Sequence, residues 1–103
     1  MLKHALFARL EAKPGKEAEV AAFLETALSL ARQEATTPLW FALKLSPTIF
    51  GVFDAFYDDA ARQKHLQGPI AQALMARAPE LLAQPPSIEA IDILGGKTAL
   101  AAA

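Results

Sequence analysis

The sequence predicts an α+β fold of the ferredoxin-like type, in which four antiparallel strands form one sheet with helices on one face. Three observations predict it. A chain of 103 residues is long enough for one domain with one core. The spacing of apolar residues alternates along the chain between every second residue, typical of strands, and every third or fourth residue, typical of helices, in the order β-α-β-β-α-β. The apolar residues favour helices, with 23 alanines and 15 leucines against seven valines and isoleucines, so the few β-branched and aromatic stretches mark the strands.

The first strand is predicted over residues 2–12, where apolar side chains recur at every second position. Lys13-Pro14-Gly15 is a turn signature, because proline fixes φ and glycine accepts positive φ. From Lys16 the apolar residues recur at helical spacing, and glutamates lie near the positive end of the helix dipole. This helix is expected to end between residues 34 and 38.

Two strands are predicted next, over 39–45 and 49–57, joined by the hairpin Ser46-Pro47-Thr48. Asp58 and Asp59 offer an N-cap for a short helix over 60–67. Gly68 interrupts that helix, and Pro69 favours the start of another, since proline is tolerated in a first turn.

The last strand is predicted over 87–94, and 95–103 form a small-residue tail of the single domain 1–103. The third and fourth strands are bulky on both faces, although helices can cover only one face of the sheet. A second copy of the same sheet is the simplest cover for the other face, so the sequence predicts a homodimer.

Charge and composition exclude several classes of function. Ten basic residues balance eleven acidic ones with no basic run, which argues against a nucleic-acid partner. The absence of cysteine excludes disulfides, thiolate metal sites and thiol nucleophiles. No apolar run approaches the ~20 residues of a membrane span. Lys3, His4 and Arg9 interrupt any signal-peptide core, so we expect a cytoplasmic protein without a membrane partner.

His65 and Asp54 are the candidates for proton transfer. Histidine takes and gives protons near neutral pH, and His65 lies at a predicted helix end. A structural role at that helix end is the alternative. Asp54 interrupts an aromatic-rich strand, where a desolvated carboxylate suits proton abstraction from a phenol or orientation of His65. Its alternative is an ion pair with Arg9, Lys44 or Arg62.

The aromatic residues between Trp40 and Tyr57 suit the walls of a pocket for a flat or quinonoid ligand, although most are expected in the core or a dimer interface. Trp40 is the favoured wall, with Phe56, and Arg9 is a candidate anion partner. No phosphate loop, zinc-protease motif, nucleophile elbow or dinucleotide fingerprint occurs, so we expect no cofactor and no metal.

Four segments together resemble the antibiotic biosynthesis monooxygenase domain of the dimeric α/β-barrel superfamily. They are Lys13-Pro14-Gly15-Lys16, the run 40–44, the run 53–61, and His65-Leu66 before Gly68-Pro69. The likeness extends to about Leu94. The family pattern has a glutamate at Asp54, a tryptophan at Phe56 and a histidine at His65.

The resemblance implies a dimer of two such sheets and a pocket between sheet and helices in each subunit. It implies a cofactor-independent monooxygenase that deprotonates a quinol or polycyclic phenol, whose anion reacts with molecular oxygen. A non-catalytic dimer that binds a small hydrophobic ligand is the alternative. Haem binding is less favoured, because the first strand lacks the asparagine of haem-degrading members.

Overall fold

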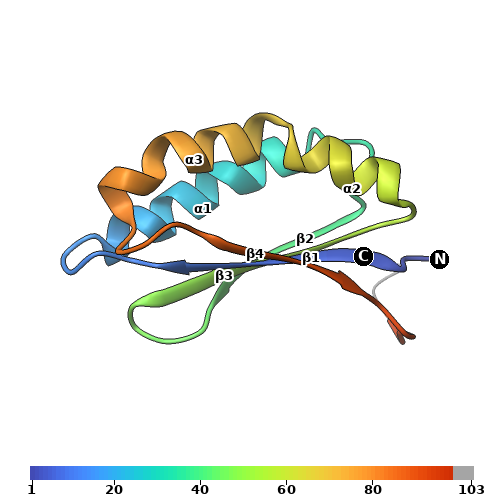
Figure 1. Ribbon diagram of the computed structural model, residues 1–103, viewed down its shortest axis with the longest axis horizontal. Coiled ribbons are helices and arrows are strands. Elements are labelled where there is room, and N and C mark those ends of the chain that lie inside the picture. The colour runs from blue at the N-terminus through green and yellow to red at the C-terminus, as the bar shows by residue number, and fades with distance from the viewer. Residues whose placement is uncertain (99–103) are drawn as a thin grey trace.

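Four antiparallel strands form one sheet in the order β2-β3-β1-β4. The computed structural model describes residues 1–98. Its elements are β1 His4–Glu11, α1 Glu17–Ala31, β2 Leu39–Lys44, β3 Ile49–Phe56, α2 Asp59–Leu66, α3 Pro69–Leu81 and β4 Ser87–Asp92 (Figure 1). The predicted α+β class and element order are confirmed. β4 ends two residues earlier than expected, 95–98 adopt neither helix nor strand, and the rest of the predicted tail lies outside the described residues.

Local chemistry explains the main boundaries. Gly15 has φ of 85°, the left-handed conformation that glycine adopts without strain, and it turns the chain between β1 and α1. Asp58 caps α2, since its Oδ1 accepts from the Ala61 N–H at 2.8 Å. Pro69 occupies the first turn of α3, as expected. The predicted turns and cap therefore set the chain reversals that frame the site.

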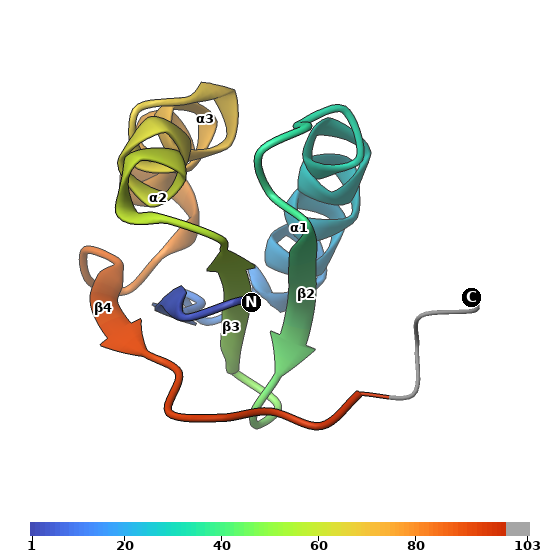
Figure 2. The same cartoon turned by 90° about the vertical axis from the view of Figure 1, so that its right-hand side faces the viewer.

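All three helices cover the same face of the sheet (Figure 2). Strand residues with even numbers in β1 and β3 point to the helices, so Leu10 and Phe50 pack there against Val20 and Leu24 of α1. These four side chains are at most 4% exposed. This core packs α1 and the end of α3 over one half of the sheet, and the other half carries the site.

The second face of the sheet carries no helix (Figure 2), and several large apolar side chains are exposed on it. Phe41 and Leu43 of β2 and Leu45 after it are 44%, 37% and 42% exposed. Phe7 and Phe53 lie beside each other across β1 and β3 on this face and are partly exposed. The expectation of bulk on both faces of β3 is thus confirmed. Among the described residues, no helix is long and apolar enough to cross a membrane.

Candidate functional site

Two rows of side chains across the sheet form the floor of a pocket. Register places Asp54 on β3 between Trp40 on β2 and Leu6 on β1. The next row toward the hairpin contains Val52 and Ala8. Side chains that are directly opposite on neighbouring strands have Cβ atoms about 4.5–5.5 Å apart. Antiparallel pairing therefore places the one carboxylate of the floor beside its one indole.

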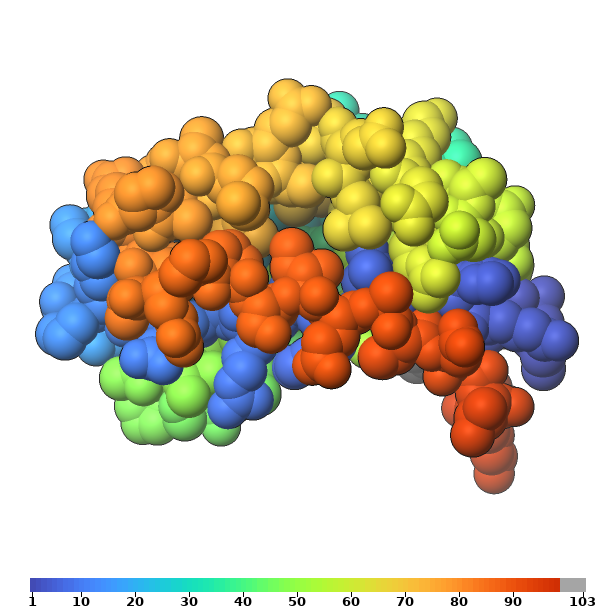
Figure 3. Space-filling model, viewed as in Figure 1, coloured from blue at the N-terminus to red at the C-terminus, as the bar shows by residue number. Residues whose placement is uncertain are grey.

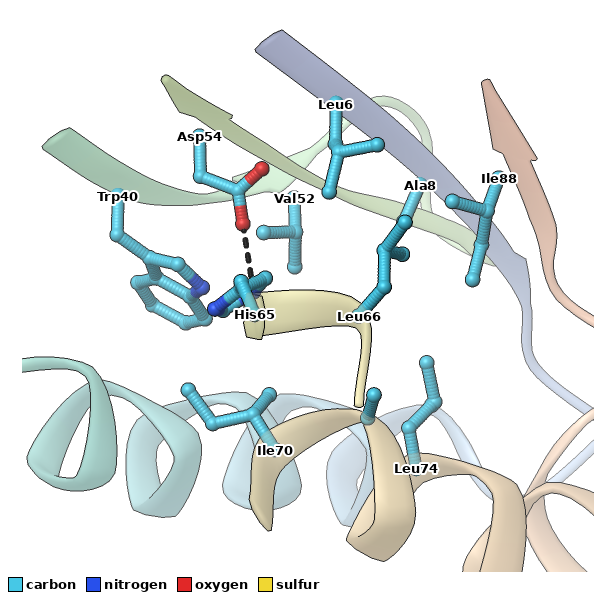
Figure 4. A pocket seen from close by; sticks show the side chains of 11 residues that line it. Leu6, Ala8, Trp40, Val52, Asp54, His65, Leu66, Ile70, Leu74 and Ile88 are labelled. Carbon is cyan, nitrogen blue, oxygen red and sulfur yellow. Dashed lines mark ion pairs between the residues drawn. The ribbon is translucent and has the colours of Figure 1, made fainter. Parts of the chain in front are cut away.

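The end of α2 and the start of α3 form the roof. Gly68 connects them, and its N–H donates to the His65 carbonyl at 3.0 Å. A Cβ at this position would lie 3.3 Å from that carbonyl oxygen and 3.4 Å from the one of Lys64, so a larger residue would crowd the turn. The tight connection holds His65 in the last turn of α2, above Asp54 (Figure 4).

The pocket between floor and roof has a volume of about 50 Å³. Its polar residues, Asp54, His65 and Trp40, gather at one end, and Ile88 and Leu74 lie at the other (Figure 4). Ile88 is 41% exposed, and the surface is hollowed between α3 and β4 (Figure 3). The pocket thus runs from an apolar mouth to a polar end. Its apolar lining consists of Leu6, Ala8, Val52, Leu66, Ile70, Ala71, Leu74 and Ile88.

His65 lies between two carboxylates. Its Nε2 is 2.9 Å from Oδ2 of Asp54, and its Nδ1 is 2.7 Å from Oε1 of Glu34. The Thr37 hydroxyl donates to the same Glu34 oxygen at 2.9 Å. The side chains of Asp54 and His65 are 3% and 7% exposed, so both hydrogen bonds lie in a medium of low polarity. A hydrogen-bonded chain therefore links β3, α2 and the segment after α1.

The surroundings of His65 raise its pKa above the ordinary value of 6.5. Burial is the largest single effect and lowers the pKa, because it disfavours the imidazolium. The hydrogen bonds and negative charges of Asp54 and Glu34 together outweigh burial. An imidazolium can donate from both ring nitrogens, which matches a carboxylate oxygen at each. The two carboxylate oxygens are therefore placed to suit the protonated form of His65.

Three buried polar atoms of this site have no hydrogen-bond partner among the described residues: Oδ1 of Asp54, Nε1 of Trp40 and Oε2 of Glu34. Buried polar atoms in native proteins nearly always have partners, and an exception needs a reason. Asp54 and Trp40 both line the pocket, and the indole nitrogen points toward the His65 end (Figure 4). Two residues that line the pocket thus have one acceptor and one donor without a partner.

Three of the residues singled out from the sequence meet in this pocket: Asp54, His65 and Trp40. The alternative pairing of Asp54 with a surface cation is wrong. Arg62 instead pairs with Asp59 at 2.7 Å, and Lys44 lies 5.8 Å from the centre of the Phe50 ring.

Phe56 and Arg9 do not line the pocket. Phe56 is fully buried, and its ring centre lies 5.4 Å from that of His65, so it supports the imidazole from behind. Arg9 pairs in register with Gly51 on the opposite face of the sheet, where it is exposed. Alternation along β1 turns Arg9 away from Ala8 and hence from the pocket.

Glu34 is the residue of the site that sequence reasoning missed. It lies in the segment between α1 and β2, thirty-one residues before its partner His65. A contact at such a distance leaves no periodic signal. Among residues 1–98, no cluster of histidine and acidic side chains is arranged to hold a metal ion, because His65 itself separates the two carboxylates.

Solved structures resemble this chain closely, although no protein-family model and no curated protein matches its sequence. The protein of unknown function NE2512 from Nitrosomonas europaea is 59% identical over 95% of each chain, with a TM-score of 0.92. Rv0793 from Mycobacterium tuberculosis is 18% identical over 93% of this chain and 99% of its own, with a TM-score of 0.81. A structure described as an antibiotic biosynthesis monooxygenase is 17% identical over 89% and 99%, with a TM-score of 0.76. The last two share the fold.

Proposed function

We propose that this chain, which belongs to the family of the Nitrosomonas europaea protein NE2512 and has the antibiotic biosynthesis monooxygenase fold, is a cofactor-independent monooxygenase. In this proposal the protein deprotonates a quinol or phenol-type substrate, whose anion then reacts with molecular oxygen. The observation that carries the proposal is the Asp54–His65 pair at the polar end of an apolar pocket. A general base at hydrogen-bonding distance of a bound hydroxyl is the chemistry such a substrate needs.

Asp54 is the base, because its Oδ1 is the unpartnered acceptor and both nitrogens of His65 are already bound. Nε2 of His65 lies 2.9 Å from Oδ2 of Asp54 and orients the carboxylate, so that Oδ1 can take the proton of the substrate. The Trp40 N–H is free to donate to a substrate oxygen, and the apolar walls hold the rings. In this assignment Phe56 orients His65, and Arg9 has no contact with the substrate.

The reaction balances without an external reductant. For an anthrone-type substrate, the ring methylene becomes a carbonyl, one oxygen atom enters that carbonyl, and the other leaves as water with both methylene hydrogens. Four electrons pass from the substrate to O₂. The protein contributes the removal of the first proton and its return to the reduced oxygen, and proton transfer of this kind contributes roughly 10²–10⁴-fold to a rate.

The size of the pocket restricts how a substrate sits. A cavity of about 150 Å³ holds benzene, whereas this pocket measures about 50 Å³. We therefore infer that only the hydroxyl-bearing edge of a ring enters, next to Asp54. The remaining rings lie at the mouth, against Leu74 and the exposed side chain of Ile88.

Oxygen consumption with a panel of quinols and anthrones tests the proposal. We expect His65→Ala and Asp54→Asn to lower the rate by about 10²-fold or more, with Glu25→Gln on the exposed side of α1 as the matched control. Equal rates for the parent and both variants would contradict it. A ligand that raises Tm without being consumed would support the non-catalytic binder instead.

Haem binding has less support, since both ring nitrogens of His65 face carboxylates and neither is free to bind iron. A Soret-band titration with haemin, in which we expect no shift, tests this alternative.

We further propose that the apolar face of the sheet joins two copies into a dimer. Phe41, Leu43 and Phe53 belong to that face, and a second identical face is complementary to it by symmetry. Sedimentation of the parent and of Phe41→Glu tests this, since a charge within an apolar interface should release monomers. A monomeric parent at micromolar concentration would contradict it.

A further inference from the structure

We propose that Glu34 is a positioning residue that holds the second ring proton of His65 outside the pocket and passes it to solvent when Asp54 takes a proton from a ligand. This rests on the proposed role of Asp54 as the base. Nothing in the sequence pattern pointed to Glu34, and its contacts carry the inference.

The position of Glu34 is fixed by its own segment. Its backbone N–H donates to the Ala31 carbonyl at 3.0 Å, and its carbonyl accepts from the Thr37 N–H at 3.2 Å. The Thr37 hydroxyl also binds Oε1 of Glu34, and Thr37 is only 8% exposed. Two backbone bonds and one side-chain bond therefore hold the carboxylate against Nδ1 of His65. A carboxylate whose only role was to be solvated at the surface would not need three hydrogen bonds to fix its position.

His65 separates two cavities. The pocket lies on one side of the ring, and on the other lies a hollow of about 330 Å³, here called the outer hollow. Residues 33–36 with Lys64, Gly68 and Pro69 line the outer hollow, and His65 is the one residue that these two linings share. Nε2 binds the carboxylate of the pocket and Nδ1 that of the outer hollow. A proton on Nδ1 can thus reach solvent without passing through the pocket.

The charges explain when that proton leaves. With both carboxylates ionised, Asp54, His65 and Glu34 carry a net charge of −1. When a ligand hydroxyl gives its proton to Oδ1 of Asp54, one of the two negative charges that stabilise the imidazolium moves from Asp54 to the ligand, farther from the ring, while the burial of the ring remains. The Nδ1 proton then moves to Glu34 and on to water. The three groups again carry −1, the ligand has become an anion, and solvent has gained one proton.

The charged groups around His65 come from three elements. Asp54 belongs to β3, Glu34 to the segment after α1, and Lys64 precedes His65 on α2 and lines the outer hollow. The last turn of α2 also places His65 at the negative end of a helix dipole, which favours the cation. Among these groups Glu34 is the one carboxylate on the outer side of the ring, so replacing it changes the negative charge at Nδ1 and leaves the one at Nε2 in place.

The first test needs neither ligand nor oxygen. Nitrogen NMR of ¹⁵N-histidine-labelled protein reports the protonation of each ring nitrogen. We expect His65 of the parent to carry protons on both nitrogens at neutral pH, and Glu34→Gln to lower its pKa while Glu25→Gln does not. A neutral ring in the parent, or an unchanged titration in Glu34→Gln, would overturn the proposal. The parent measurement stands even if the variant does not fold.

The second test counts protons during anaerobic titration calorimetry with 1-naphthol in buffers of different ionisation heat. We expect about one proton released per ligand by the parent and about none by Glu34→Gln, in which His65 has lost the carboxylate at Nδ1 and carries no second ring proton to release. Equal release by both would overturn the proposal. Failure of 1-naphthol to bind would count against the proposed function alone, because the NMR titration decides the role of Glu34 separately.

Discussion

Replacing Asp54 by asparagine should destabilise the fold more at pH 6 than at pH 9. The folded pKa of His65 is raised, so the stabilisation linked to its charge is complete below the unfolded value of 6.5 and disappears as the pH rises through the folded pKa. Asp54→Asn removes one of the two charges responsible. Above that pKa the ring is neutral in both proteins, and only a hydrogen bond differs.

The size of the effect follows from burial. The side chains of Asp54 and His65 are 3% and 7% exposed, so solvent screens their interaction little. Removing one partner of a buried ion pair costs about 3 kcal/mol, a large part of the ~5–15 kcal/mol that stabilises a typical domain. With an m value of about 1.5 kcal/mol/M, the urea midpoint should fall by about 2 M at pH 6. Once the pH exceeds the folded pKa of His65, the loss should be about 1 kcal/mol, the net value of one hydrogen bond.

Urea unfolding followed by far-UV circular dichroism, at one fixed protein concentration, measures both values. Asp92→Asn is the matched control, because Asp92 is exposed on the edge strand β4 and should change stability by less than about 0.5 kcal/mol. An equal loss at both pH values, or a larger loss at pH 9, would refute the assignment of His65 as a cation held by Asp54.

Three further predictions concern the pocket and its surroundings. Ala71→Phe should fill the pocket and reduce quinol binding by tenfold or more in a calorimetric titration, with His65 titrating as in the parent. Arg9→Gln should leave kcat/KM within about twofold of the parent, since Arg9 lies on the other face; a larger loss would show that it reaches a substrate. Phe56→Ala should cost about 3–5 kcal/mol in urea unfolding, because the side chain is fully buried behind His65.

Local chemistry made most of the fold predictable. The Lys13-Pro14-Gly15 turn, the Asp58 cap and the Pro69 start each depend on a few neighbouring residues, and each lies where expected. The contact between Asp54 and His65 could only be a hypothesis from the sequence, because it depends both on the strand register of β3 and on the position of α2 above the sheet. Its alternative, pairing with a surface cation, fails since Arg62 has a closer partner in its own helix.

The rest of the site depends on contacts between distant segments. Glu34 joins His65 only because the end of α1 folds beside the end of α2, and no local pattern encodes that contact. The charge of Arg9 makes it a candidate anion partner in the sequence. Side chains alternate between the two faces along β1, however, and Arg9 points to the face opposite the pocket. The pocket volume of about 50 Å³ arises from the packing of eight apolar side chains, which no composition reveals.

The position of Trp40 has a practical consequence. It is the one tryptophan of the sequence, and it lines the pocket beside the imidazole whose charge is expected to change. The protein therefore carries its single indole fluorophore at its most informative position, and excitation near the red edge of the indole band avoids the one tyrosine. Emission spectra of the unlabelled protein should report both the titration of His65 and the arrival of a ligand, with Trp40→Phe as the blank. Compounds can thus be screened before any reaction is known.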